Sequence, residues 1–138
     1  MKILVAEDDP VALDMFEGLL AKWGHEVIAA HDGKEAERLP LEAEAPTVAV
    51  LDWVMPKRSG LDVCRTLRAR GDGSPYIILI TAKQEKKDIQ TAFDSGVDDF
   101  IRKPVAPSEL RARLKAAERI VTLQARLQER VQVAEDQY

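Results

Sequence analysis

The chain has 138 residues, of which 46% are hydrophobic and 32% are charged, and its formal net charge is −4. This length suits one domain with a sizeable core, and the negative charge argues against binding nucleic acid or an anionic membrane through bulk electrostatics. Cys64 is the single cysteine, which excludes an internal disulfide and favours a reducing, cytoplasmic setting. We expect no membrane partner, because no apolar run could cross a bilayer and Glu7 follows only four apolar residues, which leaves no signal peptide visible.

Short apolar segments alternate with amphipathic helical patterns along the chain. Strands are predicted, in chain order, at Ile3–Ala6, Glu26–Ala30, Val48–Leu51, Tyr76–Ile80 and Val97–Arg102. Helices are predicted after them, at about Ala12–Trp23, Gly33–Glu44, Ser59–Arg70, Glu85–Ser95 and from Pro107 onward. Pro40 interrupts the second helical pattern and should kink or shorten that helix.

The first, third and fourth predicted strands are apolar on both faces, which is typical of a parallel sheet covered by helices. The alternation of strand and helix predicts an α/β fold with one doubly wound, five-stranded parallel sheet and helices on both faces. In such sheets the ligand site lies beyond the carboxyl ends of the strands. Polar side chains at the ends of four predicted strands should therefore converge: Glu7, Asp8, Asp52, Thr81 and Lys103.

Three of these side chains are carboxylates, which at close range would raise one another's pKa unless a cation lay among them. Their oxygens suit a hard divalent ion, and Mg²⁺ prefers one or two carboxylates together with waters and a phosphoryl oxygen. Lys103 cannot ligate a metal because an ammonium has no lone pair, but it can hold an anion beside one. Thr81 can donate a hydrogen bond to the same anion. A phosphoryl group bridging Mg²⁺, Lys103 and Thr81 would satisfy both halves of the site.

Four short motifs now occur in order, each at a predicted strand end. They are the acidic pair Glu7–Asp8, the stretch LDWVMPKRSG around Asp52, the pair Thr81–Ala82 and the pair Lys103–Pro104. With these motifs, about residues 1–120 resemble the CheY-like receiver domain of two-component response regulators. The resemblance implies a flavodoxin-like fold with strand order 2-1-3-4-5, and by analogy a cis peptide bond before Pro104.

The resemblance also implies a role for each site residue. Asp52 would be the phosphoacceptor, a carboxylate nucleophile that takes a phosphoryl group from a sensor histidine kinase or a histidine phosphotransfer protein. Asp8, Asp52 and the backbone carbonyl of Val54 would bind Mg²⁺ directly, and Glu7 would reach it through water. Mg²⁺ and Lys103 would neutralise charge on the transferring group. The domain would catalyse its own phosphorylation and a slow self-dephosphorylation, without turnover of an independent substrate.

A switch is implied as well, with Thr81 and Phe100 as its two residues. The hydroxyl of Thr81 would move toward the phosphoryl group, and Phe100 would rotate inward to fill the vacated space. The face made by the fourth helix, the fifth strand and the fifth helix would then change. Phe100 lacks the hydroxyl of the tyrosine that many family members carry. Val54 and Lys83 occupy the positions that tune hydrolysis, and because the aliphatic Val54 cannot position a water, slow dephosphorylation is expected.

The C-terminal segment from Pro107 to Tyr138 has 32 residues and no glycine, so it would measure about 48 Å if fully helical. Residues in steps of three and four suggest a coiled-coil seam with one polar position: Ala117, Ile120, Gln124, Leu127, Val131 and Ala134. We therefore divide the chain into a receiver domain, 1–120, and a C-terminal helical extension, 121–138. The extension is expected to form a parallel homodimer or to lead to an output domain beyond Tyr138; an unpaired amphipathic helix is the alternative.

Two other function classes are compatible with parts of the pattern. One is a pseudo-receiver that is never phosphorylated and acts as an interaction or dimerisation module. The other is a Mg²⁺-dependent phosphohydrolase of the haloacid dehalogenase type, which requires a second acid two residues after its nucleophile. Val54 stands at that place. A DNA-binding output within this chain is not expected, because no room for a helix-turn-helix remains after residue 120.

Overall fold

The computed structural model describes residues 1–42, 44–71, 73–82 and 86–136. Five parallel strands form one sheet in the order β2-β1-β3-β4-β5. The strands are β1 (Lys2–Ala6), β2 (Glu26–Ala30), β3 (Val48–Asp52), β4 (Tyr76–Thr81) and β5 (Asp99–Arg102). The helices are α1 (Pro10–Lys22), α2 (Gly33–Glu42), α3 (Gly60–Ala69), α4 (Lys86–Asp94) and α5 (Pro107–Asp136). The predicted α/β class and strand order are both confirmed.

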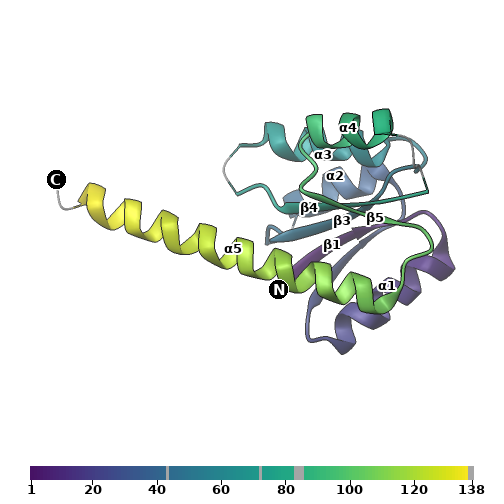
Figure 1. Cartoon of the computed structure of the whole chain (residues 1–138), viewed down its shortest axis with the longest axis horizontal. Helices are drawn as coiled ribbons and strands as arrows, with labels where there is room; N and C mark the ends of the chain where they lie inside the picture. Colours follow the sequence, from purple (N-terminus) through teal and green to yellow (C-terminus); the bar gives the residue numbers. More distant parts are fainter. Residues whose placement is uncertain (43, 72, 83–85, 137–138) are drawn as a thin grey trace.

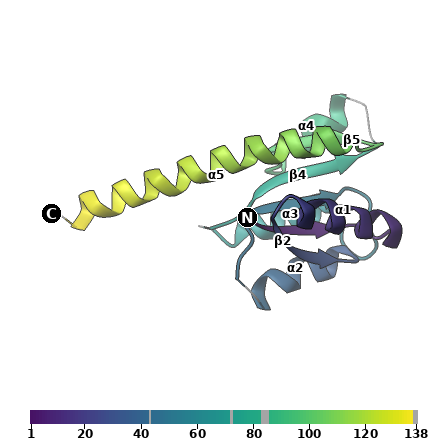
Figure 2. The same ribbon diagram turned by 90° about the horizontal axis from the view of Figure 1, so that it is seen from below.

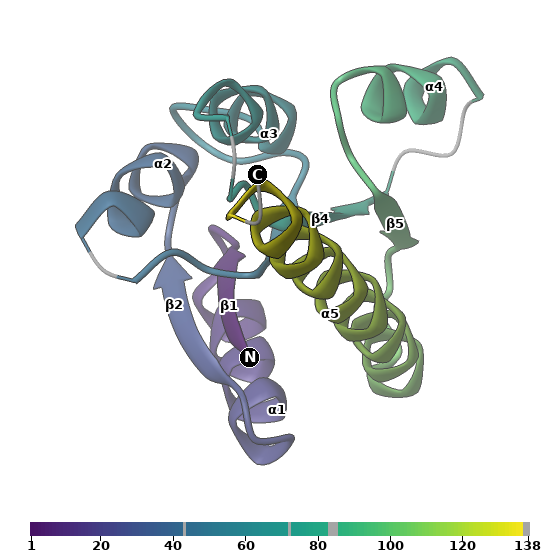
Figure 3. The same ribbon diagram turned by 90° about the vertical axis from the view of Figure 1, so that its left-hand side faces the viewer.

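The helices cover the sheet as two layers. Helices α2, α3 and α4 lie on one face, and α1 and α5 lie on the other (Figures 1 and 3). Alternate residues of each strand supply the two cores, as the two-residue period of a strand requires. On β1, Leu4 packs toward the first layer and Ile3 and Val5 toward the second. Each central strand is therefore buried on both faces, which explains its continuous apolar sequence.

Local sequence signals set most element boundaries. Asp9 caps α1 by accepting a hydrogen bond from the amide of Val11 at 3.3 Å, and Pro10 occupies the first helical turn, where its missing amide costs nothing. Ser59 and Asp62 form a reciprocal capping box at the start of α3. Helix α2 contains Pro40 and ends at Glu42, two residues before the predicted end.

The predicted start of the fifth strand at Val97 is wrong by two residues. Val97 is buried in a loop, and its neighbour Asp98 turns a carboxylate oxygen to the amide of Ile77 at 2.8 Å. The amide of Asp98 in turn donates to the carbonyl of Ile77 at 2.9 Å. The strand ladder consequently begins with the pairing of Asp99 and Ile78.

Helix α5 is longer than the sheet it covers. Leu110, Leu114 and Ala117 are buried against the sheet, whereas Leu123 and Leu127 are 56% and 61% exposed. The second half of the helix leaves the domain and projects past the amino ends of the strands (Figures 1 and 2). This agrees with the predicted helical extension up to Asp136; Tyr138 lies outside the described residues. None of the described helices has the combined length and apolar character that a membrane span requires.

Two glycines give a matched test of the packing around β3. A methyl group on Gly60 would meet the carbonyl of Asp52 and approach Leu79 Cδ1 to 3.0 Å, whereas a methyl on Gly18 would meet nothing within 4 Å. We expect Gly60→Ala to lower the free energy of unfolding by about 1–3 kcal/mol, because backbone must move. Gly18→Ala should raise it by about 0.5–1 kcal/mol, because Gly18 lies inside α1. Urea unfolding measures both, and equal effects would contradict the packing described.

Candidate functional site

The strand ends bring the predicted polar residues to one edge of the sheet. Asp52 is the last residue of β3 and Thr81 the last of β4, while Glu7 and Lys103 directly follow β1 and β5. Backbone hydrogen bonds extend the ladder past the strands: the amide of Glu7 donates to Ala30 at 3.1 Å, and that of Lys103 to Thr81 at 2.9 Å. The parallel register therefore fixes the backbone positions of these residues at the edge of the sheet.

Three carboxylates gather at this edge. One oxygen from each of Glu7, Asp8 and Asp52 lies within 4.8 Å of the other two. Glu7 and Asp52 are each only 4% exposed, whereas Asp8 is exposed and faces solvent. Carboxylates this close repel one another strongly in a poorly solvated position, so the cluster requires positive charge nearby.

Lys103 supplies part of that charge. Its ammonium nitrogen lies 3.1 Å from each carboxylate oxygen of Asp52. Partial burial lowers the pKa of Lys103, but the hydrogen bond to Asp52 and the negative charges of Asp52, Glu7 and Asp8 outweigh it and raise that pKa above its ordinary value. The peptide bond that follows, Lys103–Pro104, is cis, as family analogy predicted.

The surroundings of Glu7 indicate that the ammonium of Lys103 alone does not balance the charge of the three carboxylates. Its Oε2 atom is buried and has no hydrogen-bond partner. Burial raises the pKa of Glu7 from 4.5 to about 8, and the hydrogen bond and negative charge of Asp52 add to the rise, while Lys103 opposes it. In the metal-free protein Glu7 is therefore largely protonated at neutral pH. An oxygen-only cluster with an orphaned buried atom fits a hard divalent cation such as Mg²⁺.

The metal role expected for the carbonyl of Val54 stays a prediction. Val54 lies in the loop after β3, and its side chain is 67% exposed. An exposed aliphatic group beside Asp52 leaves no side-chain donor or acceptor at that position. Lys83, the other residue predicted to tune hydrolysis, lies outside the described residues.

Thr81 and Phe100 lie on neighbouring strands and on the same face of the sheet. Thr81 is 2% exposed and pairs with Arg102, and Phe100 pairs with Leu79, two residues earlier on β4. Phe100 is half-buried against the core of the α2–α4 layer. Its ring contacts Phe93 of α4 edge-to-face, with the ring centres 5.9 Å apart. The two predicted switch residues thus share one face of the sheet on neighbouring strands, and their roles in a switch stay a prediction.

Trp53 does not lie at the rim of the site, although it follows Asp52 directly in the chain. The side chain is only 8% exposed and belongs to the core under α3. The backbone explains the difference: the amide of Trp53 donates to Ile80 at 2.9 Å, and its carbonyl accepts from Gly60 at 2.8 Å. The indole therefore turns inward, and because Trp53 follows Asp52 in the chain, its fluorescence is expected to respond to changes at the site.

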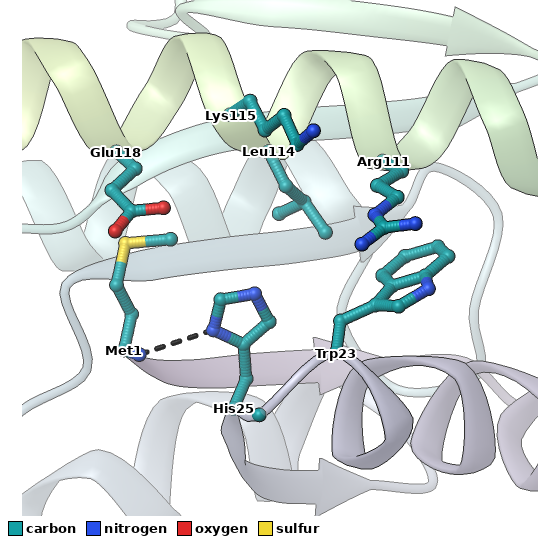
Figure 4. A pocket seen from close by; sticks show the side chains of 8 residues that line it. Met1, Trp23, His25, Arg111, Leu114, Lys115 and Glu118 are labelled. Atoms are coloured by element: carbon teal, nitrogen blue, oxygen red, sulfur yellow. Dashed lines mark hydrogen bonds between the residues drawn. The ribbon is translucent and has the colours of Figure 1, made fainter.

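A separate pocket of about 240 Å³ lies at the opposite, amino edge of the sheet (Figure 4). There the N-terminal ammonium of Met1 donates to His25 Nδ1 at 3.0 Å, and the guanidinium of Arg111 lies 5.6 Å from the ring centre of Trp23. His25 is half-buried in this contact. Burial and the neighbouring ammonium lower the pKa of His25. The pocket lies away from the strand-end carboxylates and is a structural contact between α5 and the loop after α1.

Comparison with known proteins agrees with this geometry. The family model of the response regulator receiver domain matches residues 3–115. The chain belongs to this family. Over 116 residues the receiver domain is 40% identical to the response regulator MprA of Mycobacterium avium, covering 84% of this chain and 50% of that protein. The chain spans about half the length of the curated relatives it matches.

Two solved structures superpose closely on this one. The N-terminal domain of an uncharacterized protein from Wolinella succinogenes is 35% identical, with a TM-score of 0.81 over 90% of this chain and 98% of that one. The BeF3-activated receiver domain of Klebsiella pneumoniae RstA is 30% identical, with a TM-score of 0.77 over 85% and 97%. The flavodoxin-like fold expected from the motifs is thereby confirmed.

The raised pKa of Glu7 makes metal binding depend on pH. Below pH 8 a cation must displace the proton on Glu7, so the apparent Mg²⁺ affinity should rise with pH, by up to roughly tenfold per unit, and level off above about 8. Fluorescence of Trp53 in a Trp23→Phe background, which leaves Trp53 as the single tryptophan, measures the affinity at each pH. Glu7→Gln should flatten the profile. A profile that is equally steep in Glu7→Gln would show that another group carries the proton.

Proposed function

We propose that this receiver domain accepts a phosphoryl group on Asp52 from the phosphohistidine of a sensor histidine kinase or a histidine phosphotransfer protein, with Mg²⁺ as cofactor. The observation that carries the proposal is the placement of Asp52: a buried carboxylate at the end of a central strand, with both oxygens 3.1 Å from Lys103 and two further acids within 4.8 Å. Membership of the family supports the same assignment.

The proposed step is a phosphoryl transfer between two side chains. A carboxylate oxygen of Asp52 attacks phosphorus, the phosphorus–nitrogen bond breaks, and its electron pair stays on the departing imidazole. Lys103 donates hydrogen bonds to the phosphoryl oxygens as they approach, in place of part of its contact with Asp52. Asp8, Asp52 and the carbonyl of Val54 would hold Mg²⁺ directly, and Glu7 would reach it through water. The bound ion would neutralise the remaining negative charge of the transferring group.

The proposed switch couples this chemistry to the α4–β5–α5 face. The hydroxyl of Thr81 would donate to the new phosphoryl group, and Phe100 would rotate into the space that Thr81 leaves. Raising an active population from about 1% to about 99% requires a free-energy bias of roughly 5.5 kcal/mol. A few charge-assisted hydrogen bonds, each of about 1.5–3 kcal/mol, supply a bias of that size.

We further propose that residues 1–120 act as the receiver and that residues 121–138 carry its signal in the cytoplasm, either through a homodimer or to an output domain beyond Tyr138. The continuous helix and its exposed apolar residues Leu123, Leu127 and Val131 support this division. The hydrolase alternative is disfavoured because Val54 replaces the acid it requires and because the chain belongs to another family. The pseudo-receiver alternative predicts a different result in the experiment that follows.

Phosphorylation of Asp52 is tested by intact-mass analysis after incubation with acetyl phosphate and Mg²⁺. We expect the wild type and the control Asp14→Asn, an exposed change on α1, to gain the mass of one phosphoryl group. Asp52→Asn should gain none, and Lys103→Ala should react at least about tenfold more slowly, because one charge-assisted contact is lost. An unmodified wild type would favour the pseudo-receiver, and an equally modified Asp52→Asn would show that a residue other than Asp52 accepts the phosphoryl group.

The exposed side chain of Val54 predicts a long-lived acyl phosphate. Val54→Asn adds an amide that can orient an attacking water, so it should shorten the lifetime of the phosphorylated protein by about tenfold or more. The matched control is Val11→Asn, since Val11 is also a strongly exposed valine, 76% exposed, on α1. Loss of the phosphoryl group is followed by intact mass after the donor is removed. Equal lifetimes for Val54→Asn and the wild type would contradict the prediction.

A further inference from the structure

A groove of about 930 Å³ lies at the amino edge of the sheet, opposite the candidate phosphorylation site. One wall consists of the loops that precede β3, β4 and β5, including Ala45, Pro75 and Val97. The other wall is the half of α5 that has left the sheet and runs beneath those loops (Figure 1). The groove therefore exists only because α5 continues beyond the domain.

A single guanidinium joins the described residues of the loop wall. Arg68 of α3 donates to the carbonyls of Gly96 and Pro75, to the hydroxyl of Ser74 and to the carboxylate of Asp98. These five hydrogen bonds use all five N–H donors that an arginine has. The loops before β4 and β5 are thus tied together, and the positive charge of Arg68 is paired with Asp98. A preformed wall loses little conformational freedom when a partner binds.

The helix wall carries no charge. Ile120, Gln124 and Leu127 line the groove, and these three residues belong to the coiled-coil seam predicted from the sequence. Arg126 is the one charged residue between positions 120 and 128, and it does not line the groove. Leu127 is 61% exposed and Ile120 38%, so this wall offers a run of exposed apolar side chains along one helix.

We infer that the groove receives the projecting half of α5 from a second copy of this chain. Arg68 and Asp98, the two charged residues that line the groove, pair with each other, so an uncharged helix face can occupy the groove without leaving either charge unpaired. The projecting half of α5 presents such a ridge, with Leu123, Leu127 and Val131 exposed along it. In a two-fold dimer each helix would pack seam to seam with its partner while its flank contacts the partner's loop wall. The interface thereby includes residues of the receiver as well as the helix.

Phe93 connects this groove to the proposed switch. It lines the groove with 44% of its surface exposed, and its ring packs edge-to-face on Phe100. A rotation of Phe100 would remove that support and change the loop wall. Docking should therefore become tighter or weaker on phosphorylation, a consequence that rests on the proposed function, whereas the groove contact itself does not.

Sedimentation equilibrium of the whole chain tests the groove contact. We expect the unphosphorylated wild type to form a reversible dimer. Leu127→Glu, on the seam, and Ala45→Arg, on the exposed loop wall, should each raise the dimer dissociation constant by about tenfold or more. The control Ala21→Arg, an exposed change on α1, should leave it within about twofold. A monomeric wild type, or a dimer that Leu127→Glu disrupts and Ala45→Arg does not, would overturn the inference.

Amide hydrogen exchange of the wild type tests the same contact without a substitution. Raising the protein concentration should slow exchange at residues 45–47 and 73–76 along with residues 120–131, and protection of the helix alone would contradict groove docking.

The link between the groove and the switch is tested with Phe93→Leu. A Phe93→Leu protein that intact mass shows to be phosphorylated should lose the change in dimer affinity that the wild type shows. Failure of Asp52 to accept phosphate would count against the proposed function, and the unphosphorylated comparison would still decide the groove.

Discussion

Crowding of negative charge at the carboxyl edge of the sheet is the constraint on which the rest of this structure depends. Glu7, Asp8 and Asp52 converge there, and the ammonium of Lys103 pairs with Asp52 alone among them. Glu7 has a buried oxygen without a hydrogen-bond partner and a raised pKa. Both show that Lys103 does not balance the negative charge of all three acids. A site with incompletely balanced negative charge is suited to bind a cation and, with it, an anion that Lys103 and Thr81 can contact.

The parallel register of the sheet brings the three carboxylates together at its carboxyl edge. Because β1, β3 and β4 are apolar on both faces and covered by two helical layers, their polar residues are confined to the strand ends. The same register pairs Phe100 with Leu79, two residue pairs from Thr81 on the same face of the sheet. The continuation of α5 past the sheet places the proposed dimer surface at the far edge, so the proposed phosphorylation site and the proposed dimer contact lie at opposite ends of the sheet.

Much of this could be predicted from the sequence because strand ends are marked by abrupt changes from apolar to polar residues. That signal located Glu7, Asp52, Thr81 and Lys103 before their contacts were known. It could not place Trp53, because a residue just past a strand end can turn either way, and here the return of the chain to Gly60 turns the indole inward. Nor could it reveal the groove, whose wall depends on how Arg68 joins two loops that are distant in sequence.

The central claim is that the crowded carboxylates need a cation. Urea unfolding at pH 9 tests it most directly, because this pH lies above the raised pKa of Glu7, which is about 8. A raised carboxyl pKa contributes stability at low pH that is lost as pH rises through that value, so at pH 9 the ionised Glu7 should destabilise the metal-free protein. Glu7→Gln should therefore be the more stable protein in chelator, and saturating Mg²⁺ should remove or reverse its advantage. A wild type at least as stable as Glu7→Gln in chelator, with no gain from Mg²⁺, would contradict the account.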